Sequence, residues 1–590
     1  MHLFRQPLLF LLFCIAFSPM AIASNNKLDE KANQLFDTVF DEWLARSPLW
    51  QTDLGIKTDY DKWDDLSETF QQQTHELHQQ QLKRLHAIDR KQLSSELALS
   101  YRLLELQLTN DIEHFQWRYH GYPINQMFGW HTTVPSVLIN QHTITSLNDA
   151  KAYISRLKAV PRLMDQVIDG LDSRAKKGII APKFVFPMVI EDSLNLLKGA
   201  PFDKGENSAL LNDFTVKVNN LDLKQKQKQL LIADAEQALS RQLKPAYLKL
   251  IDTLKSLEKQ ADDRAGAWKF PKGEDFYNAA LKRTTTTNLT ANNIHQLGLN
   301  EVSRIHRDMQ TILQQVKFDG SLQEFFTFMK EDKQFYHPND QEGKAAYLAR
   351  TQAVIAEIKS KLGELFITQP KADLIVKAVE AFREKSAGKA FYQSPPPDGS
   401  RPGIYYVNLY DMRNMPTYQL QALAYHEALP GHHMQLSIAT ELGDIPRFRK
   451  YSHFTAYIEG WGLYSELLPK EMGLYKDPYS DFGRLAMELW RACRLVVDTG
   501  LHAKKWTREQ AIDYLVENTP NPREDARRAI ERYIVMPSQA TAYKIGMLKI
   551  LELRETSKKE LGGDFDIRAF HDRLLRLGAV PLNVLEEELL

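Results

Sequence analysis

Three histidines and a glutamate in one short stretch have the types and spacing that a hydrolytic metal site needs. His426-Glu427 begins like the H-E-x-x-H pattern, in which two imidazoles on one helix face bind zinc and the glutamate takes a proton from water. Pro430 stands where the second histidine belongs, and the next histidines are His432 and His433. The stretch therefore predicts a metal site with Glu427 as its general base.

The spacing of the histidines predicts a break in the helix. In an unbroken helix His432 would point about 240° away from His426, and His433 would share its face but lie roughly 10.5 Å along the axis. Neither position suits one ion. Pro430 removes a backbone donor, and Gly431 permits unusual backbone angles. A break there that absorbs two residues returns His432 to the metal, so we favour His432 as second ligand and keep His433 as the alternative.

A third ligand is expected from a following helix, because catalytic zinc takes three protein ligands and leaves one position for water. Glu459 and Glu466 lie seven residues apart on an apolar, aromatic segment and share a helix face. Two buried carboxylates there need a cation or hydrogen-bond donors. We favour Glu459 as the ligand. Glu466 is either a surface carboxylate or a partner that orients a ligand histidine.

The elements that must position these residues are mostly helices. Apolar residues recur at spacings of three and four along most of the chain, which predicts a mainly α protein. The predicted helices cover residues 28–45, 94–116, 149–177, 223–260, 292–315, 344–362, 415–425, 456–466, 482–504, 507–518, 522–534 and 539–561.

A small sheet is expected beside the metal-site helix. Residues 372–379 contain β-branched side chains, and residues 404–409 follow a Pro- and Gly-rich loop, so both segments are predicted as strands. The second strand could pair with an extended peptide or serve the fold alone. Arg401 in the loop could bind a substrate carboxylate, although a solvated loop residue is the simpler interpretation.

The N-terminus has the three parts of a secretory signal peptide. Arg5 supplies a basic start, residues 8–17 form an apolar run, and Ala21-Ile22-Ala23 offers a cleavage site. The run is too short for the roughly 20 residues that span a bilayer. Cys14 does not follow a small residue, which disfavours lipid attachment. Residues 1–23 are thus predicted to be removed, with the mature protein periplasmic or secreted.

Composition limits the mature chain further. Residues 24–590 are expected to form a single helical domain, with the chemistry-bearing motifs in 390–555. No later segment reaches 18 consecutive apolar residues, so no transmembrane segment is expected after cleavage. Lys plus Arg and Asp plus Glu are 75 each, which argues against a nucleic-acid partner. Cys493 then remains as a lone cysteine and is expected to be a small buried hydrophobe.

Three segments resemble the signatures of the bacterial family called domain of unknown function 885: residues 426–435, 459–466 and 536–546. That family is similar to the all-helical gluzincin-type zinc peptidases of the carboxypeptidase Taq, thimet oligopeptidase and angiotensin-converting enzyme groups. The resemblance implies a large helical zincin-like body with a deep cleft. Those peptidases carry H-E-x-G-H and a downstream glutamate, which match His432 and Glu459, although this chain has two extra residues between its histidines.

These observations predict a peptidase with one zinc ion, ligands His426, His432 and Glu459, and short peptides as substrates. The resembling peptidases use a late tyrosine or histidine to stabilise the oxyanion, which implies this role for Tyr543; an ordinary core tyrosine is the alternative. A non-catalytic protein that binds peptides or cell-wall fragments is the second hypothesis, and metal-dependent hydrolysis of another substrate is the third. The sequence does not indicate the oligomeric state.

Overall fold

A computed structural model of the chain describes residues 19–380, 384, 388–395, 401–443 and 445–590. The basic start and apolar run of the predicted signal peptide lie outside the described residues, as do residues 396–400 of the predicted loop.

The described part of the chain is mainly α, as predicted. The α-helices are α1 (Pro19–Leu44), α2 (Pro48–Asp53), α3 (Glu68–His86), α4 (Ser95–His114), α5 (Trp130–Ser136), α6 (Leu147–Lys176), α7 (Val185–Leu196), α8 (Ala209–Asn219), α9 (Gln225–Ala238), α10 (Lys244–Glu258), α11 (Gly273–Thr285), α12 (Ala291–Gln315), α13 (Leu322–Glu331), α14 (Gln341–Lys359), α15 (Thr417–Glu427), α16 (His432–Glu441), α17 (Arg447–Lys450), α18 (Thr455–Glu471), α19 (Pro478–His502), α20 (Arg508–Asn518), α21 (Arg523–Val535), α22 (Ala542–Leu561), α23 (Ile567–Arg576) and α24 (Leu582–Leu589).

Local sequence explains where many helices begin. The side chain of Thr290 accepts from the backbone N–H of Asn293 at the start of α12, which satisfies a donor that the first turn leaves free. The buried residues of α12 recur at helical spacing and pack against α19. The helix predicted over residues 223–260 is two helices, α9 and α10, joined by a π-helical segment at Leu239–Leu243.

A three-stranded mixed sheet lies beside the helices that carry His426 and His432. Its strands are β1 (Leu374–Ala378), β2 (Ala390–Gln393) and β3 (Gly403–Val407). The strand order is β1-β3-β2, with β1 parallel and β2 antiparallel to β3. Both predicted strands are confirmed, and β2, which has four residues, was missed. The proposed pairing of β3 with a peptide is wrong, because β1 and β2 occupy both of its edges.

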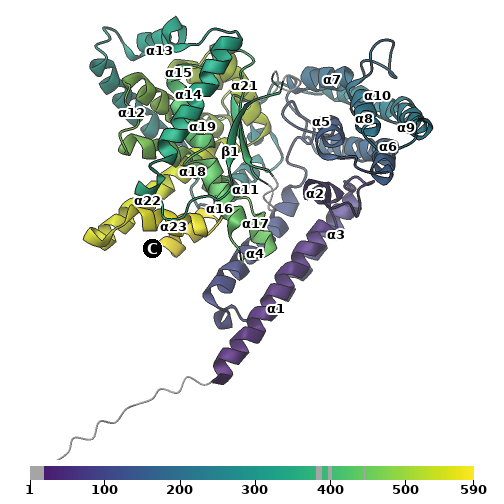
Figure 1. Ribbon diagram of the computed structural model, residues 1–590, viewed down its shortest axis with the longest axis horizontal. Coiled ribbons are helices and arrows are strands. Elements are labelled where there is room, and N and C mark those ends of the chain that lie inside the picture. Colours follow the sequence, from purple (N-terminus) through teal and green to yellow (C-terminus); the bar gives the residue numbers. More distant parts are fainter. Residues whose placement is uncertain (1–18, 381–383, 385–387, 396–400, 444) are drawn as a thin grey trace, which may run out of the picture.

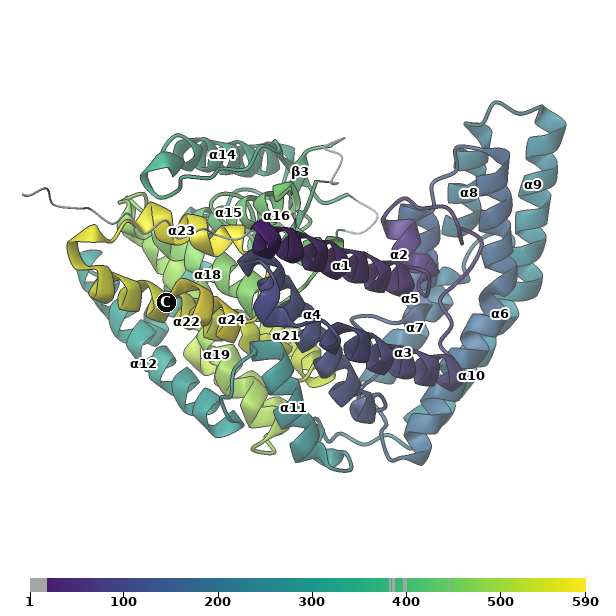
Figure 2. The same cartoon turned by 90° about the horizontal axis from the view of Figure 1, so that it is seen from below.

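Two groups of helices lie in different parts of the molecule, and the sheet belongs to one of them. Helices α6, α8, α9 and α10 pack together at one end of the molecule, away from the strands (Figures 1 and 2). The sheet, α12 and the helices from α14 to α24 gather at the other end, with α18 and α19 among them (Figure 1). Cys493 is buried inside α19, as expected. No helix of the described residues is long and apolar enough to cross a membrane.

Candidate metal centre

The helix that carries His426 breaks where the sequence predicts. Helix α15 ends at Glu427 and α16 begins at His432, so the intervening residues absorb the extra length between the histidines. Gly431 packs so closely that an added Cβ would lie 1.9 Å from the carbonyl oxygen of His426. Trp461 on α18 donates its indole N–H to the carbonyl oxygen of Pro430 at 2.9 Å and so ties the break to the next helix.

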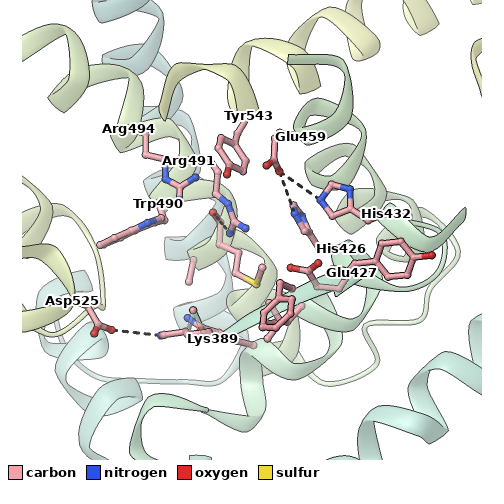
Figure 3. Close-up of a pocket in the computed structure, with 18 of the residues that line it drawn as sticks. Lys389, His426, Glu427, His432, Glu459, Trp490, Arg491, Arg494, Asp525 and Tyr543 are labelled. Atoms are coloured by element: carbon pink, nitrogen blue, oxygen red, sulfur yellow. Dashed lines mark hydrogen bonds and ion pairs between the residues drawn. The ribbon is translucent and has the colours of Figure 1, made fainter. Parts of the chain in front are cut away.

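The break brings His426 and His432 to one place, where Glu459 from α18 meets them (Figure 3). One ligand atom from each residue lies within 4.8 Å of the others. The carboxylate oxygen of Glu459 is 3.8 Å from Nε2 of His426 and 3.5 Å from Nε2 of His432. This buried group could hold a metal ion.

The two histidine–glutamate separations are close to those expected around a single small cation. Ligand atoms of a tetrahedral zinc ion lie about 2.0–2.1 Å from the metal and hence about 3.3 Å from one another. The two histidine–glutamate distances exceed that value by a few tenths of an ångström, which side-chain adjustment can remove. Gly462 leaves the space for both imidazoles, because a Cβ there would lie 2.8 Å from Cε1 of His426 and 3.0 Å from Cε1 of His432.

A second carboxylate fixes the orientation of His426. Glu466 accepts a hydrogen bond from Nδ1 of His426 at 2.8 Å, and its side chain is 1% exposed. The bond leaves Nε2 of the imidazole directed at Glu459, the arrangement that commonly orients metal-binding histidines. Of the two roles that the sequence left open for Glu466, the buried partner of a histidine is therefore the one seen.

The electrostatics of the group are those of a buried acid–imidazole cluster. Burial lowers the pKa of His426, but its contacts with Glu459 and Glu466 outweigh that effect and raise the pKa to about 9. Burial raises the pKa of Glu459, whereas the two imidazoles hold it well below its usual value. The carboxylate is thus ionised and needs positive charge beside it, which protons or a metal ion can supply.

His433 points to a different place. Its Nδ1 lies 3.0 Å from the hydroxyl of Tyr392 on β2 and 3.3 Å from that of Ser437. Burial lowers the pKa of His433 to about 4, so its imidazole is neutral and serves the contact between α16 and the sheet. The geometry therefore favours His432 of the two candidates.

The histidine–glutamate group lies on the wall of a cavity of about 550 Å³. Glu427 and Tyr543 also line this cavity, and Tyr543 lies beside Glu459 (Figure 3). Arg401 is not among the described lining residues. The lining residues are Gly388, Lys389, Ala390, Phe391, Tyr392, Gln419, Leu423, His426, Glu427, His432, Leu436, Ile458, Glu459, Ala486, Met487, Trp490, Arg491, Arg494, Asn521, Asp525, Arg528, Arg532 and Tyr543.

Tyr543 reaches the cavity because α18 and α22 cross in close contact. A Cβ at Gly460 would lie 2.5 Å from the backbone of Gly546, and one at Gly546 would lie 1.9 Å from the carbonyl oxygen of Ala456. Only residues without a side chain permit this approach. The crossing sets Tyr543 on α22 beside Glu459 on α18.

Sequence reasoning missed the spacing role of glycines 460, 462 and 546, although all three lie inside the signature segments. It also missed Arg491 and Arg494, which line the cavity. Their spacing of three places them on one face of a predicted helix, and that was the available signal.

The fold and the site together define a mainly α protein with a buried two-histidine, one-glutamate group that could hold a metal ion. The chain belongs to the family described as bacterial protein of unknown function (DUF885), whose model matches residues 48–589.

Two solved structures are similar to this chain. A protein from Colwellia psychrerythraea, provisionally described as a lipoprotein, is 32% identical over 95% of this chain and 98% of its own, with a TM-score of 0.87. A second protein, from Shewanella oneidensis, is provisionally described as a lipoprotein of unknown function. It is 19% identical over 94% of this chain and 99% of its own, with a TM-score of 0.74, and shows that the fold is shared. Comparison with curated proteins found no match.

Proposed function

We propose that this protein is a zinc-dependent peptidase that hydrolyses short peptides. The observation that carries the proposal is the convergence of His426, His432 and Glu459 beside Glu427 on a cavity wall. Binding alone needs no proton acceptor next to the metal ligands, so the retained Glu427 favours hydrolysis over the binding-protein hypothesis.

The donor set suits zinc, and each residue has a definable task. Zinc held by the three ligands would act as a Lewis acid and lower the pKa of water to about 7. Glu427, which directly follows a ligand and is 8% exposed, takes the proton of the attacking water and passes it to the leaving amine. The hydroxyl of Tyr543 donates a hydrogen bond to the oxyanion of the tetrahedral intermediate.

We further propose that the mature protein is a single catalytic body, residues 24–590, that works in the periplasm or outside the cell. The signal-peptide pattern of residues 1–23 supports this location, and so do the provisional lipoprotein descriptions of the two similar proteins. The cavity volume suits a short peptide segment better than a folded protein.

The proposal is tested by metal analysis and peptide digestion with the full mature chain. We expect about one zinc per chain, and a fall of roughly 10²- to 10⁴-fold in kcat for Glu427→Gln with the metal content unchanged. A chelator that removes the metal should abolish hydrolysis. Unchanged hydrolysis by Glu427→Gln would remove this mechanism.

The two adjacent histidines give a matched pair for the metal assignment. We expect His432→Asn to lose stoichiometric zinc, because a catalytic site needs all three ligands. His433→Asn should retain the ion, since its side chain contacts Tyr392 and Ser437 instead. Equal metal content in the two variants would show that His432 is not a ligand.

A further inference from the structure

The cavity beside the candidate metal centre carries more positive than negative side chains. Five cationic residues and three carboxylates line it among the described residues. Asp525 pairs with Lys389 at 3.5 Å and with Arg528 at 3.2 Å, whereas Glu459 and Glu427 belong to the metal centre. The excess positive charge of the cavity therefore comes from the three remaining arginines, Arg491, Arg494 and Arg532.

Arg494 is the least satisfied of the three. Its Nε donates to the hydroxyl of Tyr533 at 2.9 Å, but its buried Nη1 has no hydrogen-bond partner among the described residues. Glu459 attracts it from beyond ion-pair distance. The Nε of Arg491 is likewise buried without a partner, and Arg532 donates to the amide oxygen of Gln539.

Arg484 and Arg156, two more deeply buried arginines of the described residues, are held by groups of the protein itself. Arg484 donates to Asp481 at 2.8 Å and to Glu488 at 3.3 Å. Arg156 donates to a threonine hydroxyl, a histidine nitrogen and a backbone carbonyl. A guanidinium that is half-buried without such partners is unfavourable unless a ligand completes it. Arg494 is therefore set up to receive an acceptor from outside the chain.

Arg494 and Arg491 lie close to residues of the candidate metal centre and to Tyr543. The guanidinium carbon of Arg494 lies 4.4 Å from the ring centroid of Tyr543. Arg491 lies 3.7 Å from Glu466, which in turn is bonded to His426. Both arginines stand on the cavity wall next to Tyr543 (Figure 3). Because Arg494 contacts Tyr543, the proposed oxyanion donor, a carboxylate bound by Arg494 would belong to a residue near the cleaved bond.

We infer that Arg494, assisted by Arg491, binds a carboxylate of the substrate on the leaving-group side of the cleaved bond. This inference rests on the proposed peptidase function and names its substrate class. The planar guanidinium matches a carboxylate with two parallel hydrogen bonds. The carboxylate comes either from the C-terminus of the peptide, which makes the enzyme a carboxypeptidase, or from an aspartate or glutamate side chain.

Three peptides separate these sources: a free acid, the C-terminal amide of the same sequence, and that amide with one residue after the cleaved bond replaced by glutamate. We expect the free acid to exceed the neutral amide by about 10- to 100-fold in kcat/KM, the range of one charge-assisted hydrogen-bond pair. Release of one or two C-terminal residues identifies the C-terminal source. Preference for the glutamate-containing amide identifies the side-chain source. Equal hydrolysis of all three peptides overturns the inference.

Substitutions of Arg494 test whether this residue causes the preference for the free acid over the amide. Arg494→Gln should bring the ratio of kcat/KM between acid and amide close to one, and Arg494→Lys should restore part of it through charge alone. If Arg494 only orients Tyr543, the variant lowers both rates equally and the ratio stays, which overturns the inference. Arg568→Gln is the matched control, because Arg568 is an exposed arginine paired with Asp566.

Binding to the Glu427→Gln variant keeps the inference separate from the proposed function. Calorimetry with the free acid and the amide measures carboxylate recognition without hydrolysis. Preferential binding of the acid that Arg494→Gln abolishes supports the carboxylate site even if the wild-type chain cleaves no peptide. Cleavage without any preference in binding or rate leaves the peptidase proposal standing and overturns the carboxylate site.

Discussion

Two polar clusters share helix α19 (Pro478–His502), and they differ in whether their charges satisfy one another. The first, here the closed network, consists of Glu301, Arg304, Glu488 and Lys544. Lys544 lies 2.6 Å from Glu488 and 2.9 Å from Glu301, and Arg304 contacts both carboxylates. Burial raises the pKa of Glu488, but these cations and Arg484 lower it to about 2.

The second, here the open cluster, consists of the metal-centre residues and the arginines beside them: His426, His432, Glu459, Glu466, Arg491 and Arg494. Among the described residues, four of its buried atoms have no hydrogen-bond partner: Nδ1 of His432, Oε2 of Glu466, Nε of Arg491 and Nη1 of Arg494. Since buried polar groups are nearly always paired, such atoms need an explanation.

The difference separates structural charges from functional ones. Both clusters contain strongly charged side chains, and they lie close together in the sequence, since Lys544 directly follows Tyr543. The presence of charge alone therefore does not distinguish the closed network from the open cluster. The closed network needs nothing from outside, and its role is to hold α12, α19 and α22 together. The open cluster has unpaired atoms that a cation and an anion from outside the chain could complete, as the proposed substrate-binding metal site requires.

Breaking the closed network should have the largest effect on stability. Lys544→Met leaves the buried Glu488 with less compensation, and removing one partner of a buried ion pair costs about 3–5 kcal/mol of the free energy of unfolding. Zinc content of the folded fraction should not change. Denaturant titration measures the effect, with the exposed Lys558→Met on the same helix as control. A loss no larger than that of the control would show that the network is not structural.

Asp498 adds a third case to the comparison, because it is a buried carboxyl of α19 whose charge is neutralised by a proton instead of a cation. It accepts from the hydroxyl of Tyr277 at 2.6 Å and from the backbone N–H of Ser538 at 3.1 Å, and burial raises its pKa to about 7. The folded chain therefore keeps a proton between roughly pH 4 and 7 that the unfolded chain loses. Its stabilising contribution is complete below that window and is lost as the pH rises through 7.

We expect this group to lower the free energy of unfolding by up to about 1.4 kcal/mol per pH unit between pH 4 and 7. Asp498→Asn keeps a neutral hydrogen-bonding group, so the variant should lack this slope and exceed the wild type in stability at pH 8. Urea titrations from pH 4 to 8 measure both curves. Parallel curves would contradict a protonated Asp498.

A substitution in the open cluster is expected to have a smaller effect, and the effect should be on metal affinity. Glu466→Gln removes the charged partner of His426, and loss of such a partner typically weakens metal affinity about 10- to 100-fold. The free energy of unfolding without metal should change little by comparison. Competition with a zinc chelator measures the affinity, with Glu471→Gln, an exposed glutamate of the same helix, as control. Unchanged affinity would mean that the contact with Glu466 does not orient the imidazole.

Local patterns were sufficient for much of the fold and part of the site. Amphipathic spacing predicts α12, α19 and α22, because burial of one helix face is a local property of the sequence. Pro430-Gly431 predicts the helix break, because a missing backbone donor and a permissive glycine act on the local backbone. The strand β2 was missed because four residues carry too little periodicity, and the middle position of β3 was missed because strand order depends on distant pairing partners.

The sequence by itself determined the mainly helical class, the break before His432 and the candidates for a metal site. Only the tertiary structure decided which atoms converge. It turned His432 toward Glu459 and His433 toward Tyr392. It also paired Lys544 with two carboxylates and left a nitrogen of Arg494 without a partner among the described residues. The physical reason is that helical spacing is set by neighbouring residues, whereas pairing of a buried charge depends on side chains from helices far apart in the sequence.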